Sequence, residues 1–106
     1  MDKDRILAVI DRDAQIRRQY WKLRKDGTVR YCIIGGLMEE AGLAVTETVT
    51  PQENKDTINH LAKIMDFLMT EFDVSKDFLE DLQHINDRYE RRPARQRALR
   101  EFVESQ

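Results

Sequence analysis

Several features that mark particular protein classes are scarce in this chain of 106 residues. Its single cysteine, Cys32, excludes an internal disulfide and a cysteine-rich zinc site. Four glycines and two prolines are few for a β-sandwich with many tight turns. No apolar run approaches the roughly 18 residues of a membrane span, and charged residues stand where a signal peptide would become apolar. These absences predict a cytoplasmic protein that does not enter a membrane.

The residues that are abundant point to a helical globular fold. Charged residues make up 36% of the chain and apolar residues 41%, which is too apolar for a disordered chain. The length suits one hydrophobic core. We therefore predict a single domain, residues 1–106, of the all-α class, built as a compact bundle of about five helices.

The first segment allows two interpretations. Apolar residues at helical spacings predict an amphipathic helix over residues 3–23. However, Asp26-Gly27 is a strong turn signal, and the residues on either side of it are apolar and aromatic. A competing prediction is therefore a short hairpin near residues 20–31, in which 21–23 pairs with 29–31.

Four further helices follow from apolar spacing and capping residues. Gly42 fits the left-handed position that closes a helix, Thr50 with Glu53 can form a capping box, and Ser75 can cap the helix after it. The predicted helices cover residues 30–41 and 51–72, a segment from Ser75 to about Tyr89, and a short last segment from Pro93.

The small net charge of −2 hides a strong segregation of charge along the chain. Residues 1–38 carry nine basic against five acidic residues, residues 39–90 carry four against thirteen, and residues 91–106 carry five against two. The basic ends can neutralise the acidic middle by packing against it, or the two signs can form separate faces for partners.

The acidic middle gives the first functional hypothesis. Its carboxylates can imitate a phosphate backbone and occupy the groove of a partner protein. The predicted partner-binding residues are Glu71, Asp73, Asp77, Glu80 and Asp81.

The basic C-terminal run gives the alternative hypothesis. Beside Tyr89, a dense series of arginines can bind phosphates and stack on a base, as in a nucleic-acid-binding regulator. The residues of this alternative site are Arg88, Arg91, Arg92, Arg95, Arg97 and Arg100.

A small thiol enzyme is the third hypothesis. Cys32 lies near the start of a predicted helix, whose dipole lowers a thiol pKa, and His84 with Asp87 can supply a base and an orienting group. The competing interpretation makes Cys32 a core residue, because free cysteine is among the most buried residue types. No metal-ligand spacing surrounds either histidine, and Gly35-Gly36 lacks the rest of a phosphate loop, so we expect no metal and no cofactor.

Self-association is a separate prediction. The apolar face of the 51–72 helix is broader than one thin bundle needs to cover, since Met65, Phe67 and Met69 all contribute to it. We expect a homodimer formed through this face.

A combination of short motifs is similar to one in a group of small bacterial and phage proteins of unknown function. Trp21, the run Cys32-Ile33-Ile34-Gly35-Gly36-Leu37, and Asn86-Asp87 resemble that group's Trp, its Cys-x-x-Gly-Ala-Leu helix and its downstream Asn-Asp. Gly36 stands where the group has alanine. The resemblance implies a helical fold in which Trp21, Cys32, Gly35 and Asn86-Asp87 lie near one another.

The resemblance also makes a phage or mobile-element origin more plausible. It does not point to any particular activity. Together with the absence of a convincing catalytic constellation, it favours the first hypothesis. We therefore expect a small non-enzymatic protein that docks on a partner protein, such as a host-defence nuclease, and inhibits or regulates it.

Overall fold

Five helices and one hairpin make up the structure, a computed structural model that describes residues 1–12, 21–23, 29–42 and 55–106. The fold is all-α, as predicted, with the hairpin as its only addition among these residues. In chain order the elements are α1 (Lys3–Asp11), β1 (Trp21–Leu23), β2 (Val29–Tyr31), α2 (Ile33–Glu40), α3 (Lys55–Phe72), α4 (Lys76–Arg88) and α5 (Arg92–Glu104).

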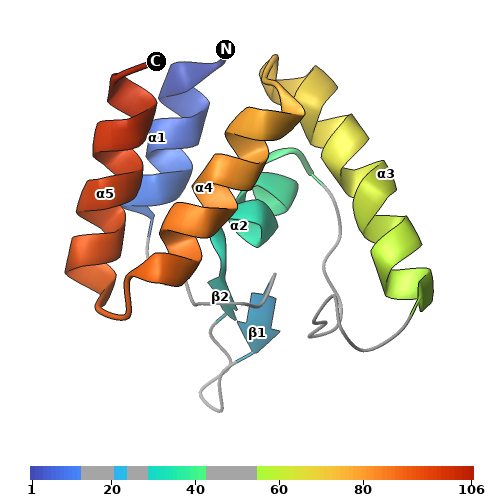
Figure 1. The fold of residues 1–106 in the computed structure, drawn as a ribbon, viewed down its shortest axis with the longest axis horizontal. Coiled ribbons are helices and arrows are strands. Elements are labelled where there is room, and N and C mark those ends of the chain that lie inside the picture. Colours follow the sequence, from blue (N-terminus) through green and yellow to red (C-terminus); the bar gives the residue numbers. More distant parts are fainter. Residues whose placement is uncertain (13–20, 24–28, 43–54) are drawn as a thin grey trace.

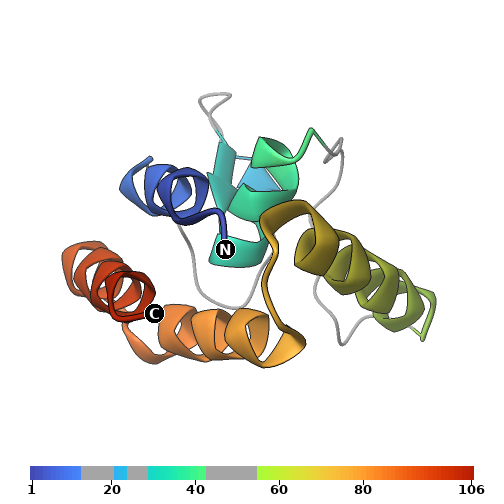
Figure 2. The same cartoon turned by 90° about the horizontal axis from the view of Figure 1, so that it is seen from above.

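Helix α2 lies at the centre of the arrangement. It contacts α1, α3, α4 and β2, while α5 packs against α1 and α4 (Figure 1). Seen from above, α5 and α3 lie on opposite sides of the molecule (Figure 2). All six residues from Ile33 to Met38 are buried, because a helix that is apolar almost all round must be covered on every side.

One hydrophobic core joins all five helices. Helix α1 contributes Ile6, Val9 and Ile10, which share one face at helical spacing. The other core residues are Cys32, Ile33, Ile34, Leu37, Met38, Leu68, Phe72, Phe78, Leu79, Leu82, Leu99 and Val103.

Three helix boundaries are confirmed by their capping geometry. Gly42 has a φ of +83° and closes α2 in the left-handed conformation. The Ser75 hydroxyl accepts a hydrogen bond of 3.0 Å from the Phe78 N–H and caps α4. Pro93 lies in the first turn of α5, where its missing N–H costs nothing. The predicted capping box at Thr50 and Glu53 lies outside the described residues.

The long first helix was a wrong prediction. Helix α1 ends at Asp11, and Arg12 is already extended with φ −63° and ψ 152°. The apolar stripe Ile6–Ile10 would have to continue at positions 13, 14 and 17, which are Asp, Ala and Arg. Two of these three residues are charged, so the apolar stripe that stabilises an amphipathic helix weakens after Asp11.

The competing hairpin is confirmed instead. β1 and β2 pair antiparallel with Trp21 opposite Tyr31, Lys22 opposite Arg30 and Leu23 opposite Val29. Aromatic and β-branched residues favour strands. For the same reason the predicted 30–41 helix begins only at Ile33, because Arg30 and Tyr31 belong to β2 and Cys32 is the N-cap.

None of the helices in the described parts of the chain is long and apolar enough to cross a membrane. The longest, α3, has charged residues within its 18 positions.

Candidate functional site

The N-terminal segment neutralises part of the acidic middle. Arg5 forms ion pairs of 3.2 Å with Glu71 and 3.7 Å with Glu40, and Arg12 pairs with Glu40 at 3.2 Å. The terminal ammonium of Met1 lies 3.1 Å from an Asp73 carboxylate oxygen. Two of the five predicted partner-binding residues, Glu71 and Asp73, thus have partners within the chain.

Asp73 also has a role in the backbone. Its φ of 52° is in the left-handed region, which non-glycine residues rarely adopt and Asp tolerates better than most. The Val74 N–H donates to the Met69 carbonyl at 3.1 Å across this residue, which is the hydrogen bond of a Schellman motif. Asp73 therefore ends α3, and its local role explains its presence without a partner protein.

The other three predicted residues form a continuous exposed surface, which we call the acidic face of α4. Asp77, Glu80 and Asp81 are all exposed in the first two turns of that helix. Among the described residues, the ion pair on this surface joins Lys76 to Glu80 at 3.8 Å, and because these side chains are 67% and 49% exposed, it neutralises little. Asp77 and Asp81 have no ion pair with any other described residue.

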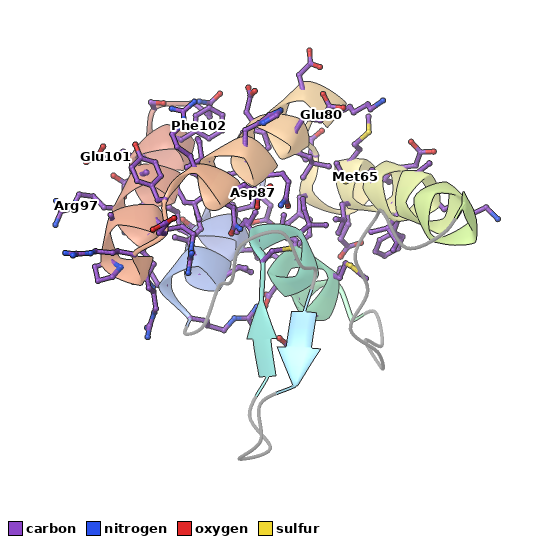
Figure 3. All side chains as sticks on the ribbon, turned by 60° about the horizontal axis from the view of Figure 1, so that its bottom comes forward. Met65, Glu80, Asp87, Arg97, Glu101 and Phe102 are labelled. Carbon is purple, nitrogen blue, oxygen red and sulfur yellow. The ribbon has the colours of Figure 1, made fainter. Side chains whose placement is uncertain are left out.

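An aromatic pair borders the acidic face. Phe78 of α4 and Phe102 of α5 stack with ring centroids 5.5 Å apart. Phe78 is 6% exposed, whereas Phe102 is only half-buried. Figure 3 shows Phe102 and Glu80 on the same side of the α4–α5 pair. The acidic face thus has a partly accessible aromatic ring beside it.

The basic run divides into two groups. Arg95 is 4% exposed and donates from Nη1 to the Tyr89 carbonyl at 3.1 Å. Arg100 pairs with Asp11, and with Glu104 at 3.0 Å. Arg95 is therefore not accessible to a ligand, and the Arg100 guanidinium, 42% exposed, already has two carboxylate partners within the chain. The exposed members of the run are Arg88, Arg91, Arg92 and Arg97.

Cys32 is a core residue. It is fully buried, and its sulfur accepts a hydrogen bond of 3.5 Å from the Gly35 N–H. Burial raises the pKa of the Cys32 thiol to about 12, and the nearby Asp87 carboxylate contributes in the same direction. A protonated, buried thiol is a poor nucleophile. The arrangement therefore does not favour the thiol-enzyme hypothesis.

Asn86 is the polar group that connects α4 to α2. It is fully buried, and its side-chain oxygen accepts a hydrogen bond of 3.0 Å from the Ile33 N–H, the first N–H of α2. Asp87 accepts a bond of 3.1 Å from Gln83. Because Trp21 lies opposite Tyr31 in the hairpin, the backbone brings Trp21, Cys32 and the Asn86-Asp87 pair into one region.

His84 lies on another side of α4. It is exposed, and it is about 200° around the helix from the buried Asn86. It is therefore not oriented as a base for Cys32. No group of three or more His, Cys, Asp or Glu side chains within the described ranges is arranged to hold a metal ion.

The apolar face of α3 is partly covered. Met65 and Met69 are half-buried against the core, and Phe67 is 39% exposed. The predicted homodimer through this face stays a prediction.

Compared with models of known protein families, with curated proteins and with solved structures, the chain matches none.

Proposed function

We propose that this chain is a non-enzymatic interaction protein that docks on a partner protein through the acidic face of α4. One observation carries the proposal: Asp77 and Asp81 are exposed acids that no described residue neutralises, although Arg5 and Arg12 neutralise other acids of the same segment. The partner surface that fits them is basic, such as a groove lined by lysine and arginine that ordinarily holds a nucleic-acid backbone.

The spacing of the acids supports such a surface. Residues four apart on a helix have Cβ atoms about 5–6 Å apart, so Asp77 and Asp81 are successive anionic points along one line. Phe102 supplies the aromatic contact that an interface of this kind needs near its centre, because charge pairs at a wet surface contribute little alone. In this proposal docking occludes the basic groove and inhibits the partner, and the resemblance to phage proteins makes a host-defence nuclease the expected class.

Affinity capture from a host lysate tests the proposal. The tagged chain, the triple variant Asp77→Asn/Glu80→Gln/Asp81→Asn and a control variant are compared, each with and without nuclease treatment. The control Glu39→Gln/Asp66→Asn/Glu101→Gln removes the same charge from exposed carboxylates outside the acidic face. We expect the wild type and the control variant to retain one discrete protein, with and without nuclease treatment. The triple variant should not retain it.

The proposal is wrong if the control variant loses the protein as completely as the triple variant does. It is also wrong if nothing survives nuclease treatment of the wild-type sample, since the retained material would then be held through nucleic acid. Circular dichroism at the capture temperature verifies that all three proteins are folded.

A further inference from the structure

Helix α3 has an exposed row of side chains that the proposed function does not use, and we call it the α3 stripe. Lys63, Phe67 and Glu71 are four residues apart, so they are neighbours along one side of the helix. All three are exposed. Among the described residues, the exposed large apolar side chains are Met1 at 41% and Phe67 at 39%. The stripe thus presents a cation, an aromatic ring and an anion in succession.

The stripe lies away from the side by which α3 packs on the rest of the protein. Leu68 and Phe72 are fully buried in the core. Phe67 is about 100° around the helix from Leu68. It is about 160° from Met65 and Met69, which are half-buried against the core. Helix α3 itself lies at the edge of the molecule (Figure 2). The surface that α3 offers to a partner is therefore narrower than the predicted apolar face and includes Phe67.

Both charged residues of the stripe can still form an ion pair with a partner. Lys63 has no ion pair with any other described residue. Glu71 accepts a hydrogen bond of 3.2 Å from Arg5, and its side chain is still 37% exposed. Arg5 also lies over the Phe72 ring, 4.6 Å from the ring centroid, so the Glu71 carboxylate is held beside a positioned cation. A carboxylate has about four lone-pair sites, which leaves Glu71 able to accept from a second cation.

The order of the charges makes the stripe complementary to itself. In a symmetric contact between two copies, residue i meets residue j and j meets i. When two α3 helices cross antiparallel at Phe67, the residue four before Phe67 meets the residue four after it in the other copy. Lys63 of each copy then faces the partner's Glu71, and the two Phe67 rings meet between the ion pairs. Rows of residues four apart interlock in the commonest class of helix packing, at a crossing angle of about −50°.

We propose that two copies of this chain associate through the α3 stripe, as a symmetric dimer in which the α3 helices cross at Phe67. The charge order favours a second copy over another partner, because a uniformly basic or acidic surface would match only one end of the stripe. A contact made by one helix from each copy is at the small end of interface sizes, below about 1,200 Å². The dimer is therefore weak and reversible.

Sedimentation equilibrium over protein concentrations from about 10 µM to about 1 mM tests the inference, because small interfaces dissociate in this range. We expect the wild type to dimerise. Phe67→Gln should weaken the dimer about tenfold, since an aromatic residue at the centre of an interface contributes most of its affinity. Lys63→Glu and Glu71→Lys should each weaken it by about the same factor, because each places like charges at both ends of the contact.

An equimolar mixture of the Lys63→Glu and Glu71→Lys variants is the sharpest arm of this experiment. Each variant repels itself, whereas the mixed dimer has opposite charges at both ends and should form with about the wild-type affinity. The controls Lys76→Glu and Glu101→Lys make the same changes of charge at exposed positions outside the stripe. Each control should dimerise as the wild type does, and so should the triple variant of the acidic face.

Three results would overturn the inference. They are a wild type that is still monomeric at about 1 mM, a dimer that Phe67→Gln leaves undiminished, and a mixture of the two folded charge variants that stays monomeric. Circular dichroism verifies folding, because Glu71→Lys also loses its pair with Arg5; Lys63→Glu and Phe67→Gln test the stripe without touching that pair. The inference does not rest on the proposed function, so either can fail while the other holds.

Discussion

The two sides of helix α4 differ in whether their polar side chains have hydrogen-bond or ion-pair partners within the protein. On the inner side, the fully buried Asn86 accepts the first N–H of α2 at 3.0 Å, next to the buried Cys32. On the outer side, Asp77 and Asp81 face solvent without an ion pair to the described residues. A buried polar group without a hydrogen-bond partner lowers the stability of the fold, whereas an exposed charge is solvated by water and needs no partner in the protein. The stability of the fold therefore does not explain a cluster of exposed acids without ion-pair partners, and binding to a partner protein can explain it.

The largest change in the free energy of unfolding is expected for a substitution on the inner side of α4. Asn86→Ala leaves the buried Ile33 N–H without its acceptor, which should lower the free energy of unfolding by about 2–3 kcal/mol. His84→Ala, at an exposed position on the same helix, should change it by less than about 0.5 kcal/mol. Urea denaturation followed by circular dichroism measures both. Equal effects would show that Asn86 does not link α4 to α2.

The next largest effect is the pH dependence of stability that the buried Cys32 thiol causes. Burial raises the pKa of the folded Cys32 thiol from its ordinary 9.0 to about 12, so above pH 9 the unfolded chain holds fewer protons than the folded one. Stability should therefore fall by up to about 1.4 kcal/mol per pH unit between pH 9 and 12.

The difference between wild type and Cys32→Ala isolates this slope from other groups. Native Cys32 should also resist iodoacetamide near neutral pH and react on unfolding. Rapid alkylation of the folded protein would return the thiol-enzyme hypothesis to consideration.

A smaller loss of stability is expected from substitutions of Gly42, which has a left-handed backbone conformation. Gly42→Ala should cost about 1 kcal/mol, because its φ of +83° is unfavourable for a residue with a β-carbon, although the space around it is open. Gly42→Asn should cost less, since Asn adopts this region more readily. Thermal unfolding compares the three proteins, and an equal loss for Ala and Asn would show that the left-handed φ of Gly42 is not the cause of the loss.

The smallest effect on stability is predicted for the acidic face itself. Glu80→Gln/Asp81→Asn should change the free energy of unfolding by less than about 0.5 kcal/mol, because exposed charges contribute little to the fold. A loss above 1 kcal/mol in urea denaturation would show that these acids support the structure and would weaken the contrast between the two sides of α4.

Sequence patterns predicted the parts of the fold that depend on local chemistry. The caps at Ser75 and Gly42 and the apolar stripe of α4 follow from side chains a few residues apart, and all were predicted. The end of α1 was missed, because the spacing from Ile10 to Ile16 was accepted as helical although the stripe positions between them, 13 and 14, hold Asp and Ala. The hairpin was left as an alternative, since strands of three residues give a weak signal.

The candidate site was predictable only as a set of residue types. Five acids and six arginines were named, but burial and pairing, which depend on long-range packing, decide which of them a partner can reach. Arg95 and Arg100 have structural roles that their spacing does not reveal, and Glu71 pairs with Arg5 across 66 positions of sequence. Asn86 was noted beside Asp87, but its bond to α2 joins residues 53 positions apart.

Carbodiimide crosslinking of the complex with its captured partner shows whether the acidic face of α4 forms the contact. This reagent joins carboxylates to lysines in contact, and mass spectrometry identifies the joined residues. We expect crosslinks from Asp77, Glu80 or Asp81 to lysines of the partner. Crosslinks confined to Glu39, Asp66 or other carboxylates outside the acidic face would contradict it.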